Sequence, residues 1–350
     1  MKHADIVNKM SLEQKAAFVS GFDYWHLEEA PELGLPKIMV TDGPHGLRKQ
    51  NPNGDSVGLG NSYPATCFPT AATSSCSWDE ELLRKEGEAL GEECLQEEVS
   101  VILGPGTNIK RAPVCGRNFE YFSEDPYLAG KCSANIINGV QSKGIGTSLK
   151  HFACNSQEAY RMVINEVIDE RAMREIYLTA FEIAIKEAQP WTVMNSYNRI
   201  NGVYASQNGW LQQQVARGEW GFQGLESQDF IQGANYAVLK EYALNGGTMT
   251  CNTGDSTMAA VSEKWPYWTV ENVSKDTDLL SAIKQAMTWQ AYALANSNAM
   301  DGYAPTTHLV SVRTWYDNAI TGTEVAFAVL TLLCAAMYIN SVRKSKSKKN

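Results

Sequence analysis

The stretch from residue 100 to residue 151, SVILGPGTNIKRAPVCGRNFEYFSEDPYLAGKCSANIINGVQSKGIGTSLKH, contains one complete strand, helix and strand unit. The apolar run at 100–103 predicts a buried strand, and the spacing of apolar residues over 129–141 predicts a helix. Residues 147–151 predict a second strand that ends in polar side chains. Two strands joined by a helix are typical of a parallel sheet, so this unit predicts an α/β fold.

The same alternation continues on both sides of this unit. Further strands are predicted at 37–40, 191–194 and 224–229, and further helices at 11–19, 78–94, 169–188 and 276–295. Polar residues follow several of the predicted strands, which is where barrel enzymes assemble their active sites. We therefore expect a (β/α)8 barrel of the TIM type over residues 1–310.

The composition argues against several classes of protein. The 350 residues carry a net charge of −9, and five basic residues lie among the last eight, so the remaining chain carries −9 − 5 = −14. An acidic body argues against nucleic-acid binding. The eight cysteines are scattered, with no Cys-x-x-Cys pair and no spacing that suits zinc, so neither a disulfide framework nor a metal site is expected.

The C-terminal region predicts a membrane segment. Residues 325–342 form eighteen positions without a formal charge, and the basic tail 343–350 follows. This length is near the lower limit for crossing a bilayer, and a buried terminal helix is the alternative, but the basic tail favours a single transmembrane helix after a linker at 311–324. The first residues contain no apolar segment typical of a cleaved secretory signal, so the side of the membrane that the barrel faces stays open.

A second signal lies in the segment 116–128, GRNFEYFSEDPYL, together with Lys150 and His151. Planar donors and carboxylates bind hydroxyl groups, while aromatic rings cover the C–H surfaces of a sugar. The pattern predicts a pocket for a polyhydroxylated, uncharged ligand such as a sugar.

Six segments, in order, resemble the N-terminal barrel domain of glycoside hydrolase family 3, the family of many β-glucosidases. They are LGLPKIMVTDGPHGLR (33–48), LGPGTNIKRAPVCGRNFEYFSEDPYLAG (103–130), GTSLKHFACNSQEAYR (146–161), DERAMREIYLTAFE (169–182), PWTVMNSYNRING (190–202) and EWGFQG (219–224). The resemblance covers residues 8–235. It implies a retaining β-glycosidase, most simply a β-glucosidase, which needs no metal or organic cofactor.

The resemblance also implies roles for individual residues. Asp229 matches the catalytic nucleophile, although the family has Ser-Asp-Trp where this chain has Gln228-Asp229-Phe230. An aspartate at a strand end is otherwise a common cap. The implied sugar-binding residues are Asp42, which is otherwise a turn-former, then the cations Arg117, Lys150 and His151, and finally Arg161, Met194 and Tyr197. The positive charges are expected to keep Asp229 ionised.

The acid/base residue is not identified. The resemblance places it on a second sandwich domain in most of these β-glucosidases, whereas Glu120, Glu124 and Asp125 are expected to support the loop around Arg117 and to cap the helix that starts at Pro126. The barrel-only layout of the family has Pro-Gly and a histidine after Lys-His-Phe, which this chain lacks. The segment from 249 to 342 looks more like family members in which the barrel follows the sandwich.

Three functions follow as hypotheses. The first is a membrane-associated β-glycosidase that acts on a β-linked oligosaccharide or glycoside, with the acid/base supplied by a sandwich domain on another chain or absent. The second is a membrane-tethered sugar-binding or degenerate barrel with little turnover. The third is a barrel lyase that uses the Lys150 amine in a Schiff base.

Overall fold

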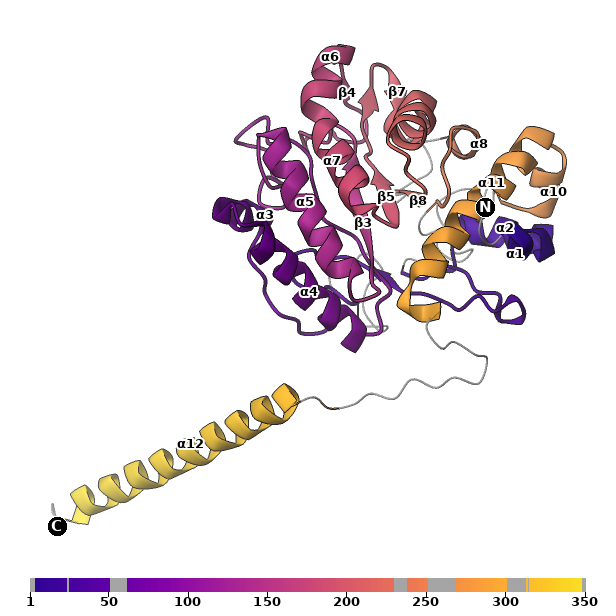
Figure 1. Cartoon of the computed structure of the whole chain (residues 1–350). Coiled ribbons are helices and arrows are strands. Elements are labelled where there is room, and N and C mark those ends of the chain that lie inside the picture. Colours follow the sequence, from indigo (N-terminus) through magenta and orange to yellow (C-terminus); the bar gives the residue numbers. More distant parts are fainter. Residues whose placement is uncertain are drawn as a thin grey trace. The chain divides into compact units, whose positions relative to one another are not determined.

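The computed structural model divides into two units, residues 1–305 and 306–350. It describes residues 4–23, 25–50, 62–229, 238–250, 268–300, 313 and 315–347. The first unit holds the sheet and the helices that pack on it, and the second holds the helix α12 (Figure 1).

Five strands form one fully parallel sheet in the order in which they occur in the chain. They are β1 (Val40–Thr41), β2 (Val101–Ile102), β3 (Gly146–Phe152), β5 (Thr192–Asn195) and β8 (Leu225–Gln228). Each strand therefore joins the preceding one through a crossover, as expected for βα units. The α/β fold is confirmed as a parallel half-barrel, while the complete eight-stranded barrel stays a prediction.

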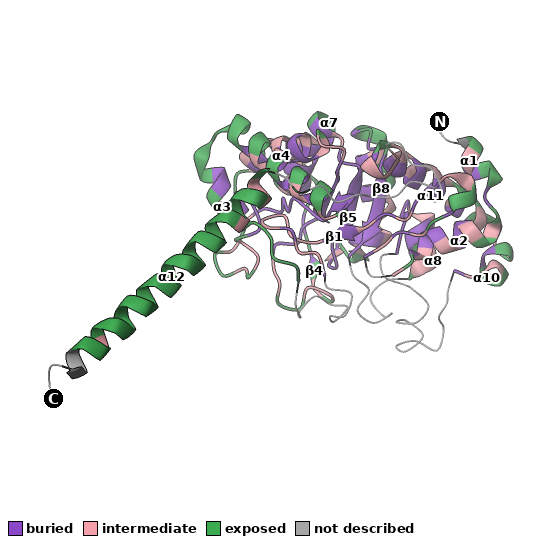
Figure 2. Cartoon of the chain, turned by 90° about the horizontal axis from the view of Figure 1, so that it is seen from below, coloured by how far each residue is buried: buried purple, intermediate pink, exposed green. Residues whose placement is uncertain are grey.

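Three helices cover one face of the sheet, which we call the α5 face. They are α4 (Glu80–Gln96), α5 (Pro126–Gln141) and α7 (Thr179–Ala188), which Figure 1 shows side by side. The helix α5 begins at Pro126 with Asp125 as its cap, as predicted, since Asp125 accepts a hydrogen bond from Leu128 N. In α4, Asp79 accepts hydrogen bonds from Glu81 N and Leu82 N. Figure 2 shows the strands as the buried centre of this unit.

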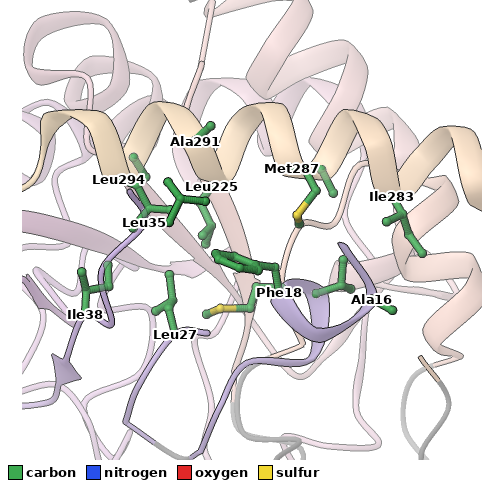
Figure 3. Packing of buried hydrophobic residues seen from close by; sticks show 14 of the residues in the cluster. Ala16, Phe18, Leu27, Leu35, Ile38, Leu225, Ile283, Met287, Ala291 and Leu294 are labelled. Atoms are coloured by element: carbon green, nitrogen blue, oxygen red, sulfur yellow. The ribbon is translucent and has the colours of Figure 1, made fainter. Parts of the chain in front are cut away.

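The opposite face of the sheet, the α11 face, packs against helices from the two ends of the unit. These are α2 (Leu12–Ser20) and α11 (Thr277–Asn296). In β5, Val193 belongs to the core on the α5 face and Met194 to the core on the α11 face, as the alternation of a strand requires. Figure 3 shows Phe18 of α2 and Met287 of α11 in the same cluster as Leu225 of β8. Ser11 caps the N-terminus of α2, and Gln14 completes a capping box.

The remaining elements are short. The predicted helix at 169–188 is divided into α6 (Glu170–Ala172), a wider π-helical turn over Met173–Tyr177, and α7. A second sheet contains β4 (Asn165–Glu166), β6 (Arg199–Ile200) and β7 (Val203–Tyr204). The other helical segments are α1 (Ala4–Lys9), η1 (Pro31–Leu33), α3 (Ala71–Ser74), η2 (Ser75–Ser77), η4 (Ala205–Gln207), the π-helix η5 (Trp210–Glu219), α8 (Leu239–Leu244), α10 (Val270–Ser274) and η6 (Asn298–Met300).

The second unit consists mainly of α12 (Trp315–Ser347). The helix includes the expected span 325–342, but it begins inside the stretch 311–324 that was expected to be a linker. Residues 315–324 contain no proline, and Asp317 lies in the first turn, where a carboxylate favours the helix N-terminus. Trp315–Lys344 is long and apolar enough to cross a membrane.

A buried ion pair joins β8 and η5. Glu226 is fully buried, and its Oε1 is 3.8 Å from Nη2 of Arg217 in η5. The Arg217 guanidinium lies over the Trp289 ring of α11, 3.5 Å from the ring centroid. Burial raises the pKa of Glu226 to about 7, although Arg217 and the Asn195 amide oppose the rise.

We predict that replacing a core residue shared by α2 and α11 destabilises the first unit. Phe18→Ala should lower the free energy of unfolding by about 3–5 kcal/mol, because Phe18 is 1% exposed and its removal leaves a cavity. Leu82→Ala on the exposed side of α4 should change it by less than about 1 kcal/mol. Urea unfolding followed by circular dichroism measures both, and equal effects would contradict this core assignment.

The raised pKa of Glu226 predicts that the free energy of unfolding depends on pH. Its pKa rises on folding from an ordinary value of 4.5 to about 7. The folded chain therefore keeps a proton that the unfolded chain loses, so this contribution is full below pH 4.5 and disappears as the pH rises through about 7. It amounts to roughly 3 kcal/mol.

Glu226→Gln should remove this component, since glutamine stays neutral. The difference in unfolding free energy between about pH 4.5 and pH 8 should then shift by the same roughly 3 kcal/mol relative to the unsubstituted chain. Glu81→Gln on the surface of α4 is the matched control. An unchanged pH dependence in Glu226→Gln would show that Glu226 does not titrate in this range.

Candidate active site

The sheet brings polar residues from distant parts of the chain to one edge. Asp42 directly follows β1, Lys150 and His151 lie at the end of β3, and Asp229 directly follows β8. Since parallel strands share one carboxyl edge, these side chains gather there. The expectation that the polar strand ends meet is confirmed by the contacts among them.

Lys150 forms the centre of the site. Its side chain is 4% exposed, and its Nζ lies 2.8 Å from Asp42 Oδ1 and 3.2 Å from Glu120 Oε1. Burial acts to lower the pKa of Lys150, but the two carboxylates outweigh it, so the net shift is upward. Burial likewise acts to raise the pKa values of Asp42 and Glu120, but Lys150 holds both below their usual range. All three groups are therefore ionised at neutral pH.

Arg117 is held on the other side of Glu120. Its Nη2 and Nε lie 2.5 and 2.7 Å from Glu120 Oε2, so Glu120 bridges Arg117 and Lys150. Burial opposes the charged form of Arg117, yet the net shift of its pKa is upward because Tyr121, Glu120 and Asp229 surround it. The Arg117 charge therefore acts on the Asp229 carboxylate at the end of β8.

His151 faces Asp229. Its Nε2 is 3.8 Å from Asp229 Oδ2, and its Nδ1 is 3.0 Å from the Tyr121 hydroxyl. The Asn108 side chain fixes the His151 backbone, because its Oδ1 accepts from His151 N at 2.8 Å and its Nδ2 donates to His151 O at 2.9 Å. Burial and the nearby Arg117 and Lys150 charges hold the pKa of His151 well below its usual value. His151 is therefore a neutral hydrogen-bonding group, not the cation that the sequence analysis expected.

Arg161 and Tyr197 contact each other and join the site through Glu158. The Arg161 guanidinium is 4.8 Å from the centroid of the Tyr197 ring, and its Nη1 is 3.0 Å from Glu158 Oε2. Glu158 Oε1 also lies 3.9 Å from Arg117 Nε. Glu158 therefore ties two of the expected sugar-binding cations together.

Part of this arrangement leaves no signal in the sequence. Glu120 had been assigned a general supporting role, but its bridge between Lys150 and Arg117 could not be inferred from sequence spacing. Asn155 and Glu158 were not considered, although they follow the predicted strand 147–151 directly. Met194 is 2% exposed and packs in the core of the α11 face, and its expected place in the pocket wall stays a prediction.

Two carboxylates of the site are poor proton donors. Asp42 and Glu120 each contact Lys150, which favours their ionised forms. Within the part of the chain that the structure describes, no three His, Cys, Asp or Glu side chains are placed to hold a metal ion. The arrangement suits a neutral ligand rich in hydroxyl groups and places one carboxylate, that of Asp229, beside a neutral donor.

The chain is similar to known glycosidases. A model of the glycosyl hydrolase family 3 N terminal domain matches residues 28–287. The chain is 54% identical over 225 residues to thermostable beta-glucosidase B of Acetivibrio thermocellus, covering 64% of this chain and 30% of that protein. It is 57% identical over 225 residues to an exo-alpha-(1->6)-L-arabinopyranosidase of Bifidobacterium breve, with the same coverage of 64% and 30%. The chain thus spans about a third of the length of these relatives.

Solved structures agree with the fold. Beta-glucosidase 3B from Thermotoga neapolitana in complex with glucose superposes with a TM-score of 0.77 at 35% identity, covering 87% of this chain and 44% of that chain. The Bifidobacterium adolescentis GH3 beta-glucosidase gives a TM-score of 0.71 at 43% identity, with coverage of 87% and 42%. In both comparisons the matched region is less than half of the solved chain.

We predict that Glu120 stabilises the site as a bridge. Glu120→Gln removes the shared counterion of Lys150 and Arg117 and should lower the free energy of unfolding by about 3–5 kcal/mol. Glu81→Gln, which breaks the exposed Lys85–Glu81 pair at 2.7 Å, should cost at most about 1 kcal/mol. Chemical unfolding of both variants measures this contrast. Equal losses would mean that Glu120 is not a buried bridge.

Proposed function

Since the chain belongs to glycosyl hydrolase family 3, we propose that it carries the catalytic barrel of a retaining β-glycosidase that releases terminal β-D-glucosyl residues. One observation carries this proposal. The Asp229 carboxylate lies at the end of β8, 3.8 Å from the neutral His151 Nε2 and under the influence of the Arg117 charge. An ionised carboxylate in such a setting is suited to attack an anomeric carbon.

The reaction has two steps. In the first, an Asp229 oxygen forms a bond to the anomeric carbon while the bond to the aglycone oxygen breaks, and the aglycone leaves after taking up a proton. In the second, water attacks the same carbon, the ester to Asp229 breaks, and the released sugar keeps its configuration.

Sugar hydroxyls would be bound by groups that are already fixed. The Asp42 carboxylate accepts hydrogen bonds, and Lys150, Arg117 and His151 donate them. Arg161 and Tyr197 complete the proposed pocket at its rim. Because Glu120 and Glu158 hold these cations before a ligand arrives, little side-chain entropy is lost on binding.

The leaving aglycone also needs a proton. Lys150 keeps Asp42 and Glu120 ionised, so these two carboxylates are unsuited to this role, and the chain covers 30% of the length of a relative. We propose that the acid/base residue belongs to a further domain, on this or another chain. A barrel that binds sugars with little turnover is the alternative, which the pairing of Asp42 and Glu120 with Lys150 favours.

We propose that α12 anchors the chain in a membrane. The helix α12 contains a candidate membrane span, Trp315–Lys344, and the basic residues of 343–350 follow its apolar part. Its apolar side chains, such as Leu332 and Phe327, are exposed (Figure 2). A single-pass helix would hold the barrel near a bilayer.

Covalent labelling tests the enzymatic proposal. A 2-deoxy-2-fluoro-β-glucoside with a good leaving group needs little acid catalysis, so it should add one fluoroglucosyl group to the peptide that contains Asp229. Mass spectrometry of the digested chain measures this, and Asp229→Asn should not be labelled. The corresponding α-L-arabinopyranoside should be compared, because one relative is named for that sugar.

The other hypotheses give different results. Retained sugar binding without label would overturn the glycosidase in favour of the binding module. Borohydride trapping of a carbonyl ligand on Lys150 would instead support the Schiff-base lyase.

A further inference from the structure

Four side chains form a continuous hydrogen-bonded line that ends at His151. Asn155 Nδ2 lies 2.9 Å from Glu158 Oε1 and 2.8 Å from the Tyr121 hydroxyl. That hydroxyl lies 3.0 Å from His151 Nδ1. The line runs from the loop after β3 to the residue that faces Asp229.

The direction of the hydrogen bonds in this line follows from Glu158. Its carboxylate is paired with Arg161 and offers only acceptor atoms, so the NH2 group of the Asn155 amide must face it. The same NH2 group is within hydrogen-bond distance of the Tyr121 oxygen. Asn155 therefore donates to Tyr121, and its amide orientation is fixed.

The Tyr121 hydroxyl donates its hydrogen bond toward His151. Tyr121 is fully buried, and burial raises its pKa well above the ordinary value, so the hydroxyl keeps its proton. Since the hydroxyl oxygen accepts from Asn155, its proton is donated to His151 Nδ1, which is its other partner within the described residues. A neutral imidazole that accepts at Nδ1 carries its own proton on Nε2.

We propose that Glu158 and Asn155 are positioning residues which, through the Tyr121 hydroxyl, hold His151 in the tautomer with the proton on Nε2. That proton points toward Asp229 Oδ2, 3.8 Å away, where it can be donated to a sugar hydroxyl bound beside the nucleophile. The opposite tautomer would present a lone pair to the Asp229 carboxylate. The catalytic meaning of this arrangement rests on the proposed function, but the tautomer itself does not.

The surrounding contacts keep this line in place. Arg161 Nη1 lies 3.0 Å from Glu158 Oε2, and Arg117 Nε lies 3.9 Å from Glu158 Oε1. Asn108 fixes the backbone of His151 from the other side. Glu158 therefore influences the site twice, because it orients both arginines and the Asn155 amide.

The tautomer is directly measurable by NMR. In the full chain in detergent with 15N-labelled histidine, two-bond 1H–15N correlations distinguish Nε2–H from Nδ1–H, and His151→Gln assigns the signal among five histidines. We expect Nε2–H in the unsubstituted chain and a loss of this preference in Tyr121→Phe. Tyr242→Phe is the matched control, because Tyr242 is also fully buried but its hydroxyl bonds to Glu226 O and Met249 O.

The outcomes are distinct. An Nδ1–H tautomer in the unsubstituted chain, or an unchanged tautomer in Tyr121→Phe, would overturn the proposal. Because this measurement needs no turnover, it decides the matter even if covalent labelling of Asp229 fails and the proposed function is abandoned.

The role of Glu158 is tested by a conservative pair of variants. Glu158→Ala should weaken the Nε2–H preference, whereas Glu158→Gln keeps an acceptor for the Asn155 amide and should restore it. If the complete enzyme turns over, Glu158→Ala should also lower kcat/KM by about tenfold to a hundredfold, and Glu158→Gln by less. A tautomer that is the same in Glu158→Ala as in the unsubstituted chain would remove Glu158 from the proposal.

Discussion

The buried ammonium group of Lys150 is the interaction on which the site depends. It joins the residue after β1, the loop after β2 and the end of β3, because Asp42 and Glu120 are its two partners. A lone charge at this depth would be costly, and two carboxylates at hydrogen-bonding distance compensate for its loss of water. The strand ends are therefore held together by charge in addition to the backbone hydrogen bonds of the sheet.

Charges next to this group form a fixed environment for a ligand. Glu120 connects Lys150 to Arg117, and Glu158 connects Arg117 to Arg161, so cations and carboxylates alternate around the edge of the sheet. His151 stays neutral in these surroundings because the adjacent cations disfavour a further positive charge. Such preorganised dipoles and charges stabilise charge that develops during a reaction, since they need not reorient.

Local sequence patterns predicted much of this fold. Short apolar runs followed by polar residues marked β2, β3 and β5, and the cap Asp125 followed from side-chain chemistry. The packing of α2 and α11 on the same sheet face could not be predicted, because amphipathic spacing identifies a buried helix face but not its partner. The same limit applies to Glu120, Asn155 and Glu158, whose roles depend on neighbours brought close by the fold.

The packing of α2 against α11 has a consequence for synthesis of the chain. Gln290 Nε2 donates to the Phe18 carbonyl oxygen at 3.1 Å, across 272 positions. At translation rates of about 5–20 residues per second, Gln290 is synthesised roughly 14–54 s after Phe18, and the apolar face of α2 has no partner during this time. Long-range contacts of this kind slow folding and leave surfaces open to aggregation. We therefore expect the nascent chain to depend on chaperones until α11 has left the ribosome.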